Sequence, residues 1–391
     1  MRVALFSDTY PPEINGVATS TFNLRKTLIA HGDEALVVTT NPFTNKVTFE
    51  DGVLRIPGIY LKKLYGYRVS NFYSKEAMKI IERFKPEIVH CQTDVGIGIF
   101  GTIVASRFHC GMVYTFHTML EDYAYYITHG HFDRAARAIV RFYFKGQSVR
   151  FNEFIAPSDK IKDYLRSIQI DSSISVIPTG IELDRFSKQN QNNADVAALK
   201  AKYGIDPEDF VILSLGRIAK EKSIDVLLKG YAKFLRSPQK RRTKFLIIGW
   251  GPAEGELKEL VGRLGIEDNV IFGGACKPDE TQRYYHLGDC FASASITETQ
   301  GLTFMEAMAA ELPVLARYDD NLVGTIKEGE TGFFFNTEDD FAEKLSFLID
   351  LPEVKRGKII SSALKAIDPY SMEKFYQNAM GVYRRVWKAN W

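Results

Sequence analysis

Two glutamates with seven residues between them stand out as groups that could bind a polyhydroxylated substrate. Glu298 and Glu306 lie in the segment TETQGLTFMEAMA, which follows the apolar run 290–294. The pattern predicts a strand, a loop and a helix that begins near Gly301 or Leu302. Unpaired backbone N–H groups and the helix dipole favour an anion at such a helix start. One carboxylate could then face a sugar while the other accepts hydrogen bonds from a ribose diol. A helix cap followed by a surface glutamate is the alternative interpretation.

A second segment supplies two positive charges. Gly216, Arg217 and Lys222 lie in the sequence GRIAKEKS, directly after the apolar run 211–215. Glycine permits a sharp turn where a strand ends. A diphosphate leaving group gains negative charge as its bond to a sugar breaks, and positioned cations stabilise that charge without a metal ion. Loop cations that only contact water are the alternative, but the two segments together favour a diphosphate site.

Two more candidates lie in the first half of the chain. Gly16 ends the loop DTYPPEING before an expected helix over 17–30, where a side chain would block a ligand phosphate. His117 follows the expected strand 113–116, and a neutral histidine there can hydrogen-bond a substrate hydroxyl. A ligand-free turn and a structural histidine are the alternatives. The loop at Gly16 does not read GxGxxG, so it gives little support to nicotinamide binding, and cysteines, histidines and acidic residues lack metal-site spacing.

Short apolar runs alternate with helical patterns along the whole chain, and this alternation predicts how the candidates are positioned. It is typical of βαβ units, hence of the α/β class with doubly wound parallel sheets. In such sheets, ligands bind beyond the carboxyl ends of the strands, where the four segments fall. The expected strands are 3–6, 35–39, 88–91, 113–116, 154–156, 211–215, 245–248, 270–272, 290–294 and 314–316.

The length of 391 residues exceeds that of one ordinary hydrophobic core, so we expect two domains. The first is placed at 1–183 and the second at 194–370, with the polar, asparagine-rich stretch between them as a linker. Segment 371–391 is expected to be helical and rich in aromatic residues. It either packs back on the first domain or forms an ordinary terminal helix of the second.

The composition excludes several classes of protein. Hydrophobic residues make up 45% and charged residues 25%, a globular balance, and the net charge of +2 gives no general reason to bind nucleic acid. Four cysteines without a CxxC pair are typical of a reducing compartment. The sequence contains no apolar stretch near the length of about 20 residues that spans a bilayer. We therefore expect a soluble protein, or one attached to a membrane surface.

Together these segments resemble the retaining glycosyltransferases of the GT-B fold with an E-x7-E signature, a family that includes sucrose and glycolipid synthases. The resemblance covers nearly the whole chain and implies two Rossmann-like domains facing each other across a cleft. It implies a nucleotide-sugar donor, no cofactor and no strictly required metal. The resemblance implies that Glu306 binds the ribose, that Glu298 contacts the transferred sugar and that His117 hydrogen-bonds a sugar hydroxyl. Gly16 would allow donor and acceptor to approach each other closely. The residues implied to bind the donor diphosphate are Arg217, Lys222, Gly301, Leu302 and Thr303.

The run HTMLEDYAYYI, which begins at His117, resembles bacterial enzymes that glucosylate diacylglycerol. That resemblance implies transfer of glucose from UDP-glucose to 1,2-diacylglycerol with retention, giving α-monoglucosyl-diacylglycerol. Other sugars or acceptors stay open, such as those of a phosphatidylinositol mannosyltransferase or a soluble-acceptor enzyme. A sugar-nucleotide epimerase and a non-catalytic nucleotide-sugar binding module also stay open as alternatives. The intact set of Arg217, Lys222, Glu298 and Glu306 disfavours the non-catalytic module.

Basic residues beside aromatic ones predict contact with an anionic membrane. The stretch 134–150 has five basic residues and no acidic one, and the first four are spaced to share a helical stripe. Each cation contributes about 1 kcal/mol near an anionic leaflet. A solvated helix face is the alternative. We expect a cytoplasmic enzyme attached peripherally to the inner face of the cell membrane. The expected membrane-binding residues are Lys62, Lys63, Arg134, Arg137, Arg141, Lys145 and Arg150.

Overall fold

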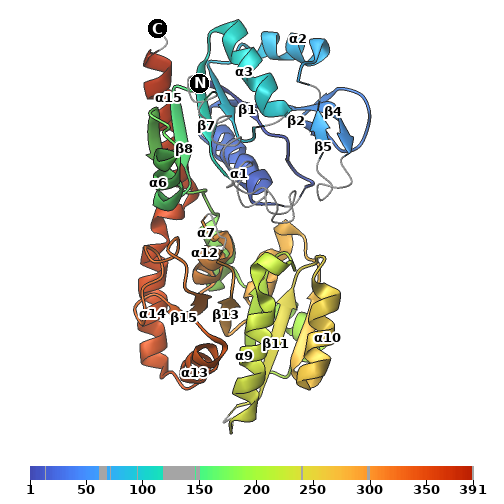
Figure 1. The fold of residues 1–391 in the computed structure, drawn as a ribbon, viewed down its shortest axis with the longest axis vertical. Helices are drawn as coiled ribbons and strands as arrows, with labels where there is room; N and C mark the ends of the chain where they lie inside the picture. The colour runs from blue at the N-terminus through green and yellow to red at the C-terminus, as the bar shows by residue number, and fades with distance from the viewer. Residues whose placement is uncertain are drawn as a thin grey trace. The chain divides into compact units, whose positions relative to one another are not determined.

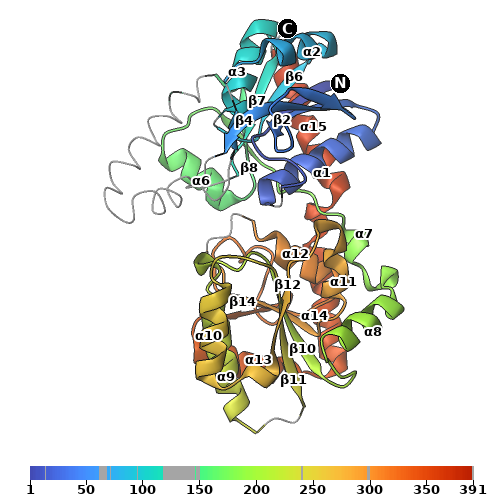
Figure 2. The same cartoon turned by 90° about the vertical axis from the view of Figure 1, so that its right-hand side faces the viewer.

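The computed structural model describes residues 1–13, 15–60, 68–70, 72–94, 96–117, 146, 150–238, 241–296 and 300–389. The chain forms two compact units (Figures 1 and 2). Unit 1 comprises Met1–Gly180 and Met372–Trp391, and unit 2 comprises Ile181–Ser371. Each unit is an α/β fold built on a mainly parallel sheet, as the alternation of apolar runs and helical patterns predicts.

The sheet of unit 1 has the strand order β3-β4-β2-β1-β6-β7-β8-β9, with β5 paired to β4. Its pairs are parallel except β3–β4 and β4–β5, which are antiparallel. The strands are β1 (Arg2–Phe6), β2 (Glu34–Asn41), β3 (Thr48–Glu50), β4 (Val53–Tyr60), β5 (Arg68–Ser70), β6 (Ile88–Cys91), β7 (Gly111–Thr115), β8 (Glu153–Ala156) and β9 (Ser173–Val176). The helices among the described residues of unit 1 are α1 (Gly16–Ala30), α2 (Lys75–Phe84), α3 (Ile97–Phe108), α6 (Asp159–Ser167) and α15 (Met372–Ala389).

Alternate residues of each central strand in unit 1 point to opposite faces of the sheet, and each face has its own apolar core. Ala4 and Phe6 pack with side chains of α2, α3 and α6. Val3 and Leu5 pack instead with side chains of α1 and α15. Continuous apolar runs such as β1 therefore form central strands that are buried on both faces.

The C-terminal helix α15 belongs to unit 1. Its side chains Phe375 and Tyr383 are buried in the core shared by β1, β6, β7 and α1. Helix α1 adds polar contacts: the ring of His31 stacks on Tyr376 at 3.7 Å between centroids, and its Nε2 lies 2.9 Å from a carboxylate oxygen of Glu373. The other ring nitrogen faces the carbonyl oxygen of Thr27 at 2.8 Å. Because both nitrogens face acceptors, chiefly the Thr27 carbonyl and then the Glu373 carboxylate, the pKa of His31 is raised above 6.5.

Unit 2 contains a six-stranded parallel sheet of order β12-β11-β10-β13-β14-β15. The strands are β10 (Phe210–Leu215), β11 (Thr243–Ile248), β12 (Val270–Gly274), β13 (Cys290–Ser293), β14 (Val314–Arg317) and β15 (Phe333–Phe335). Helices α9 (Ile224–Arg236), α10 (Glu254–Leu264) and α13 (Glu338–Ile349) pack on one face. Helices α7 (Leu183–Phe186), α8 (Asn193–Lys202), α11 (Thr281–Tyr285) and α12 (Leu302–Ala309) pack on the other, and α14 (Glu353–Ala366) adds buried side chains to both clusters.

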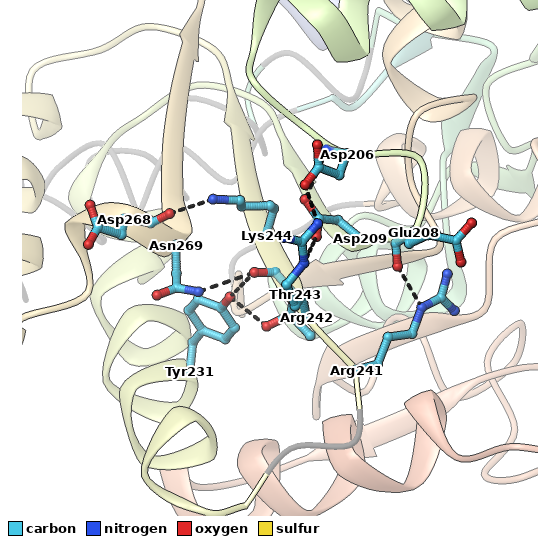
Figure 3. Close-up of polar contacts among 10 residues, drawn as sticks. All are labelled: Asp206, Glu208, Asp209, Tyr231, Arg241, Arg242, Thr243, Lys244, Asp268 and Asn269. Atoms are coloured by element: carbon cyan, nitrogen blue, oxygen red, sulfur yellow. Dashed lines mark hydrogen bonds and ion pairs between the residues drawn. The ribbon is translucent and has the colours of Figure 1, made fainter.

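A charged cluster closes the amino ends of β10 and β11 in unit 2 (Figure 3). Arg242 forms ion pairs with Asp206 and with the buried carboxylate of Asp209, whose second oxygen accepts the Asp206 N–H at 3.0 Å. The Tyr231 hydroxyl lies 2.8 Å from Oγ1 of Thr243, where β11 begins. These contacts fix the two strands at the end opposite to the expected site.

The boundary between the units differs from the expected linker. The chain passes between units at Gly180–Ile181 and at Ser371–Met372. The stretch predicted as a linker lies within unit 2, because Phe186 is buried in its core and Asn192 caps α8 by accepting backbone N–H groups. The strands expected in both halves are confirmed within one or two residues, and α1 ends as predicted just before Gly32 at φ +82°.

Candidate active site

The two charged segments of unit 2 lie at one edge of its sheet, beyond the carboxyl ends of neighbouring strands. Strands β10 and β13 are hydrogen-bonded neighbours, with Leu213 opposite Phe291. The loop after β10 carries Arg217 and Lys222, and the loop after β13 leads to α12. The Nζ atom of Lys222 lies 3.5 Å from Oγ of the buried Ser295. The fold thus brings together two segments about 75 residues apart in the sequence.

The loop after β10 rests on the backbone of another turn. Gly216, at φ +152°, donates its N–H to the Ile248 carbonyl at 2.9 Å. Ile218 donates its N–H to the Trp250 carbonyl at 3.1 Å. The turn at Trp250 lies so close that a Cβ on Gly251 would meet the Ile218 carbonyl oxygen at 2.1 Å. The glycines of the sequence GWG therefore support the loop that holds the two cations.

Arg217 and Lys222 have different surroundings. Arg217 is half-exposed and forms an ion pair with Glu221, four residues further on. Lys222 closes a 3-10 turn, Lys220–Lys222, and Ser223 then adopts a left-handed conformation at φ +48° before α9 begins. The loop therefore holds the two cations at fixed places relative to the end of β10.

The start of α12 offers backbone N–H groups to an anion. Gly301 is the N-cap residue, at φ +76°, and a Cβ there would meet Leu322 at 2.8 Å. The helix then begins at Leu302, as predicted, and its first turn carries no acidic side chain. The N–H groups of Leu302 and Thr303 are at the positive end of the helix dipole. This end of α12 suits a phosphate.

Glu306 lies on the second turn of α12 and is held by a tyrosine from α11. The Tyr285 hydroxyl lies 2.7 Å from Oε2 of Glu306 and 3.2 Å from the carbonyl oxygen of Thr303. Burial raises the pKa of Glu306 to about 7, although the Tyr285 hydroxyl and the charge of Arg185 both lower it. Tyr285 leaves the other carboxylate oxygen to accept a hydroxyl. Sequence reasoning missed Tyr285, because nothing in its local pattern links it to a glutamate 21 positions away.

In unit 1, Gly16 is the first residue of α1. The side chain of Asn15 caps the helix by accepting the Ala18 N–H at 2.9 Å, and it donates to Oγ1 of Thr9 at 2.7 Å. A Cβ on Gly16 would meet no atom of the chain within 4 Å. Contacts inside the protein therefore do not require glycine at this position, in contrast to Gly251.

His117 lies two residues beyond β7, beside a residue that follows β6. Its Nε2 atom is 2.6 Å from Oε1 of Gln92. Burial lowers the pKa of His117 to about 4, so its imidazole is neutral at physiological pH. A neutral ring is the form that we expected to hydrogen-bond a hydroxyl.

A carboxylate occupies the start of α3 in the same unit. The sequence from Gly96 to Gly101 reads GIGIFG, which fits GxGxxG. Asp8, after β1, accepts the Ile97 N–H at 3.0 Å and the Thr93 hydroxyl at 2.6 Å. Burial raises the pKa of Asp8 to about 6. Because the chain's own carboxylate takes the helix start, this glycine pattern serves packing and not a dinucleotide.

Several expected site residues lie outside the described residues. They are Glu298, Lys62, Lys63, Arg134, Arg137, Arg141 and Lys145. Arg150 is described and exposed. Within the described parts of the chain, there is no group of three or more His, Cys, Asp or Glu that could hold a metal ion. The helices described here include none with the length and apolar character to cross a membrane.

The fold of the two units together with the family matches that follow shows a glycosyltransferase of the GT-B fold, an enzyme class that transfers sugars. Residues 14–185 match Glycosyltransferase Family 4, and residues 195–365 match Glycosyl transferases group 1. The chain belongs to the family 4 glycosyltransferases.

Proteins similar to the chain over nearly its whole length include glycolipid synthases. It is 34% identical to the alpha-monoglucosyldiacylglycerol synthase of Acholeplasma laidlawii over 388 residues, which are 98% of this chain and 96% of the relative. The enzyme of the same name from Streptococcus pneumoniae is 34% identical, over 90% of this chain and 80% of its own. Among solved structures, Anabaena HepE in complex with UDP and glucose superposes with a TM-score of 0.75 at 18% identity, covering 98% of this chain and all of HepE.

Proposed function

We propose that this enzyme transfers glucose from UDP-glucose to 1,2-diacylglycerol with retention of configuration, at the surface of an anionic membrane. The observation that carries the proposal is the 34% identity to an alpha-monoglucosyldiacylglycerol synthase over almost all of both chains. The structure supports the proposal, because Lys222, Glu306 and the start of α12 offer unit 2 a cation, a carboxylate and backbone N–H groups that suit a diphosphate and a ribose.

The donor is held by charges and backbone groups of this chain. Arg217, Lys222 and the N–H groups at the start of α12 bind the diphosphate and stabilise the charge that grows as UDP leaves. Glu306 accepts hydrogen bonds from the ribose hydroxyls through the carboxylate oxygen that Tyr285 leaves open. Glu298 contacts the transferred glucose, and His117 hydrogen-bonds one of its hydroxyls. The two cations neutralise the diphosphate, so no divalent metal ion is needed.

Retention follows from a reaction on one face of the sugar. The bond between the anomeric carbon and the leaving phosphate oxygen breaks first and leaves an oxocarbenium-like sugar. The acceptor hydroxyl of diacylglycerol then attacks the same face and forms the new glycosidic bond. Its proton passes to the phosphate oxygen that has just left, so the products are UDP and an α-glucoside. No side-chain nucleophile is used.

A lipid acceptor is supported by exposed apolar side chains of unit 1. Phe43 follows β2, Ile59 lies on β4, and Phe72 and Tyr73 follow β5; β4 pairs with both β2 and β5. The four side chains are between 49% and 70% exposed, which is unusual for such large apolar groups on neighbouring segments. In the sequence, Lys62 and Lys63 lie between β4 and β5. Apolar groups beside lysines suit an anionic lipid surface.

A panel of donors and acceptors tests the proposal. UDP-glucose, UDP-galactose and GDP-mannose are each supplied with diacylglycerol, with phosphatidylinositol or without acceptor, in mixed micelles containing an anionic lipid. We expect product only from UDP-glucose with diacylglycerol, and proton NMR should show an α-glucoside. Product from GDP-mannose with phosphatidylinositol would overturn both the donor and the acceptor. A β-glucoside would overturn retention, and donor turnover without acceptor would favour an epimerase.

A further inference from the structure

A chain of hydrogen bonds connects His117 with the C-terminal helix through the interior of unit 1. His117 Nε2 lies 2.6 Å from Oε1 of Gln92, and Nε2 of Gln92 lies 3.1 Å from Nε2 of His90. His90 Nε2 also lies 2.7 Å from Oγ1 of Thr115, and its Nδ1 lies 2.7 Å from the hydroxyl of Tyr383 on α15. The three residues that make these contacts with His117 and His90 are Gln92, directly after β6, Thr115, at the end of β7, and Tyr383, on α15.

The alternation of β-strands places these groups on one face of the sheet. His90 and Gln92 follow Ile88 of β6 at every second residue, so they share its face of the sheet. Thr115 and His117 follow Val113 of β7 in the same way. Ile88 and Val113 belong to the core that α15 covers. The polar chain therefore extends this core toward the carboxyl edge of the sheet, where His117 is only partly buried.

The atoms involved determine where each proton lies. Gln92 presents its carbonyl oxygen to His117, so His117 must donate from Nε2, and its Nδ1 is an acceptor in the neutral ring. The amide nitrogen of Gln92 donates to Nε2 of His90, which also accepts from the Thr115 hydroxyl. The proton of His90 is then on Nδ1, which donates to the oxygen of Tyr383.

Both rings stay neutral, which keeps this arrangement intact at physiological pH. Burial, and to a smaller extent the neighbouring His117, lower the pKa of His90 to about 3. Burial likewise lowers the pKa of His117 to about 4. A neutral ring between a fixed donor and a fixed acceptor has a single favoured tautomer.

We propose that Gln92, held in place by His90 and Tyr383, is a positioning residue that keeps the proton of His117 on Nε2, so that Nδ1 accepts a hydrogen bond from a donor-sugar hydroxyl. The identity of the ligand as a sugar rests on the proposed function, whereas the tautomer does not. Because Nδ1 of His117 can only accept a hydrogen bond, it favours a donor sugar with a hydroxyl at the contacted position. It disfavours a sugar whose group at that position can accept a hydrogen bond but cannot donate one.

The tautomer is tested by NMR on the full-length protein with ¹⁵N-labelled histidine, recorded without ligand. We expect His117 with its proton on Nε2 and His90 with its proton on Nδ1. Gln92→Met, which keeps the side-chain length but removes both polar groups, should leave His117 as a mixture of tautomers. Gln92→Glu keeps an acceptor facing His117 and should keep the Nε2 proton. A wild-type His117 protonated on Nδ1 would overturn the proposal, whatever the enzyme's substrate is.

Kinetics with modified donors test the consequence for specificity. UDP-glucose analogues with each sugar hydroxyl replaced by hydrogen or by fluorine are compared in the wild type and in His117→Ala. At the position that His117 contacts, we expect both analogues to lose about tenfold or more in kcat/KM, since fluorine cannot donate. In His117→Ala these losses should disappear. If fluorine restored activity at that position, His117 would be a donor and the proposal would fail.

A pair of tyrosines on α15 provides a matched control. Tyr383→Phe removes the hydroxyl bound to His90, whereas Tyr376→Phe removes one bound to Asp33 at 2.9 Å, away from the chain of hydrogen bonds. We expect Tyr383→Phe to move the His90 signals and to lower kcat/KM severalfold, with Tyr376→Phe matching the wild type in both. Equal effects of the two changes would show that α15 acts only through packing. If the wild type showed the expected His117 tautomer by NMR but no activity with UDP-glucose and diacylglycerol, the proposed substrates would be refuted. The role of Gln92 in positioning the His117 proton would still stand.

Discussion

The replacement Gly251→Ala tests whether the turn at Trp250 holds in place Arg217 and Lys222, the two cations that we propose bind the donor. A Cβ on residue 251 would lie 2.1 Å from the carbonyl oxygen and 2.7 Å from the carbonyl carbon of Ile218. Ordinary contact begins at 3.4 Å, so the Ile218 carbonyl must move by about 1.3 Å. That carbonyl also accepts the Ala253 N–H at 3.1 Å and directly follows Arg217, so the displacement is transmitted to the loop.

The expected size of the effect follows from the geometry of catalysis. A misplacement of about 1 Å in groups that position a substrate can cost about a hundredfold in rate. We therefore expect kcat/KM for UDP-glucose to fall about a hundredfold, which corresponds to about 2.7 kcal/mol of lost transition-state stabilisation. Initial rates at saturating acceptor give this value, and calorimetric titration with UDP should show weaker binding.

The control is Gly255→Ala, in the first turn of α10. A Cβ there meets no atom within 4 Å, and residue 255 is exposed. Because alanine favours a helix by up to about 1 kcal/mol over glycine, this variant should keep wild-type activity and melt at the same or a slightly higher temperature. Wild-type kcat/KM and UDP affinity in a folded Gly251→Ala protein would refute the supporting role of the turn. Equal losses in the two variants would show that the effect is not specific.

Three further changes test other parts of the molecule. Lys222→Ala should lower kcat at least about tenfold, or 1.4 kcal/mol of barrier, and wild-type turnover would remove Lys222 from the diphosphate site. Tyr285→Phe removes a hydrogen bond that lowers the pKa of Glu306, about 7, so protonation of Glu306 should extend to higher pH. The KM for UDP-glucose should then rise more at pH 7 than at pH 8.5, and equal rises would contradict this. His31→Ala should lower the free energy of unfolding in urea more at pH 5 than at pH 9. The raised pKa of His31 in the folded state adds stability at pH values below the unfolded-state pKa of 6.5. This stability is lost as the pH rises through the folded-state pKa. A pH-independent loss would show that only the stacking of His31 matters.

The central strands could be predicted from the sequence, whereas the peripheral ones could not. Runs such as 211–215 are apolar at every position because both faces of β10 are covered. Strand β9, with the sequence SISV, and strand β3, with the sequence TFE, are edge strands that are partly or fully exposed, so neither has a continuous apolar pattern. Strand β4 contains Pro57 and Gly58, which argue against a strand in isolation, yet it pairs with β2.

The candidate site was predictable where it depends on one loop and its flanking strand. The start of α12 at Leu302 and the placement of Lys222 after β10 both follow from local patterns. The groups that hold the site come from distant parts of the chain: Tyr285 is 21 residues from Glu306, and Tyr383 is 293 residues from His90. Such contacts require knowledge of which elements pack together. His90 inside the apolar strand β6 and Gln92 directly after it were the available signal that this segment carries more than core residues.

The division of unit 1 into two stretches of sequence has a consequence for synthesis on the ribosome. Residues 1–180 emerge first, but Phe375 and Tyr383, which fill one face of their sheet, are translated only after the 191 residues of Ile181–Ser371. At roughly 5–20 residues per second, that interval is about 10–40 s, during which this apolar face of unit 1 has α1 as a cover but lacks α15. Unit 2, by contrast, is continuous in sequence, and its two ends meet where Ile181 donates its N–H to the Tyr370 carbonyl at 2.7 Å. All residues of unit 2 are therefore translated before unit 1 receives its last helix, α15.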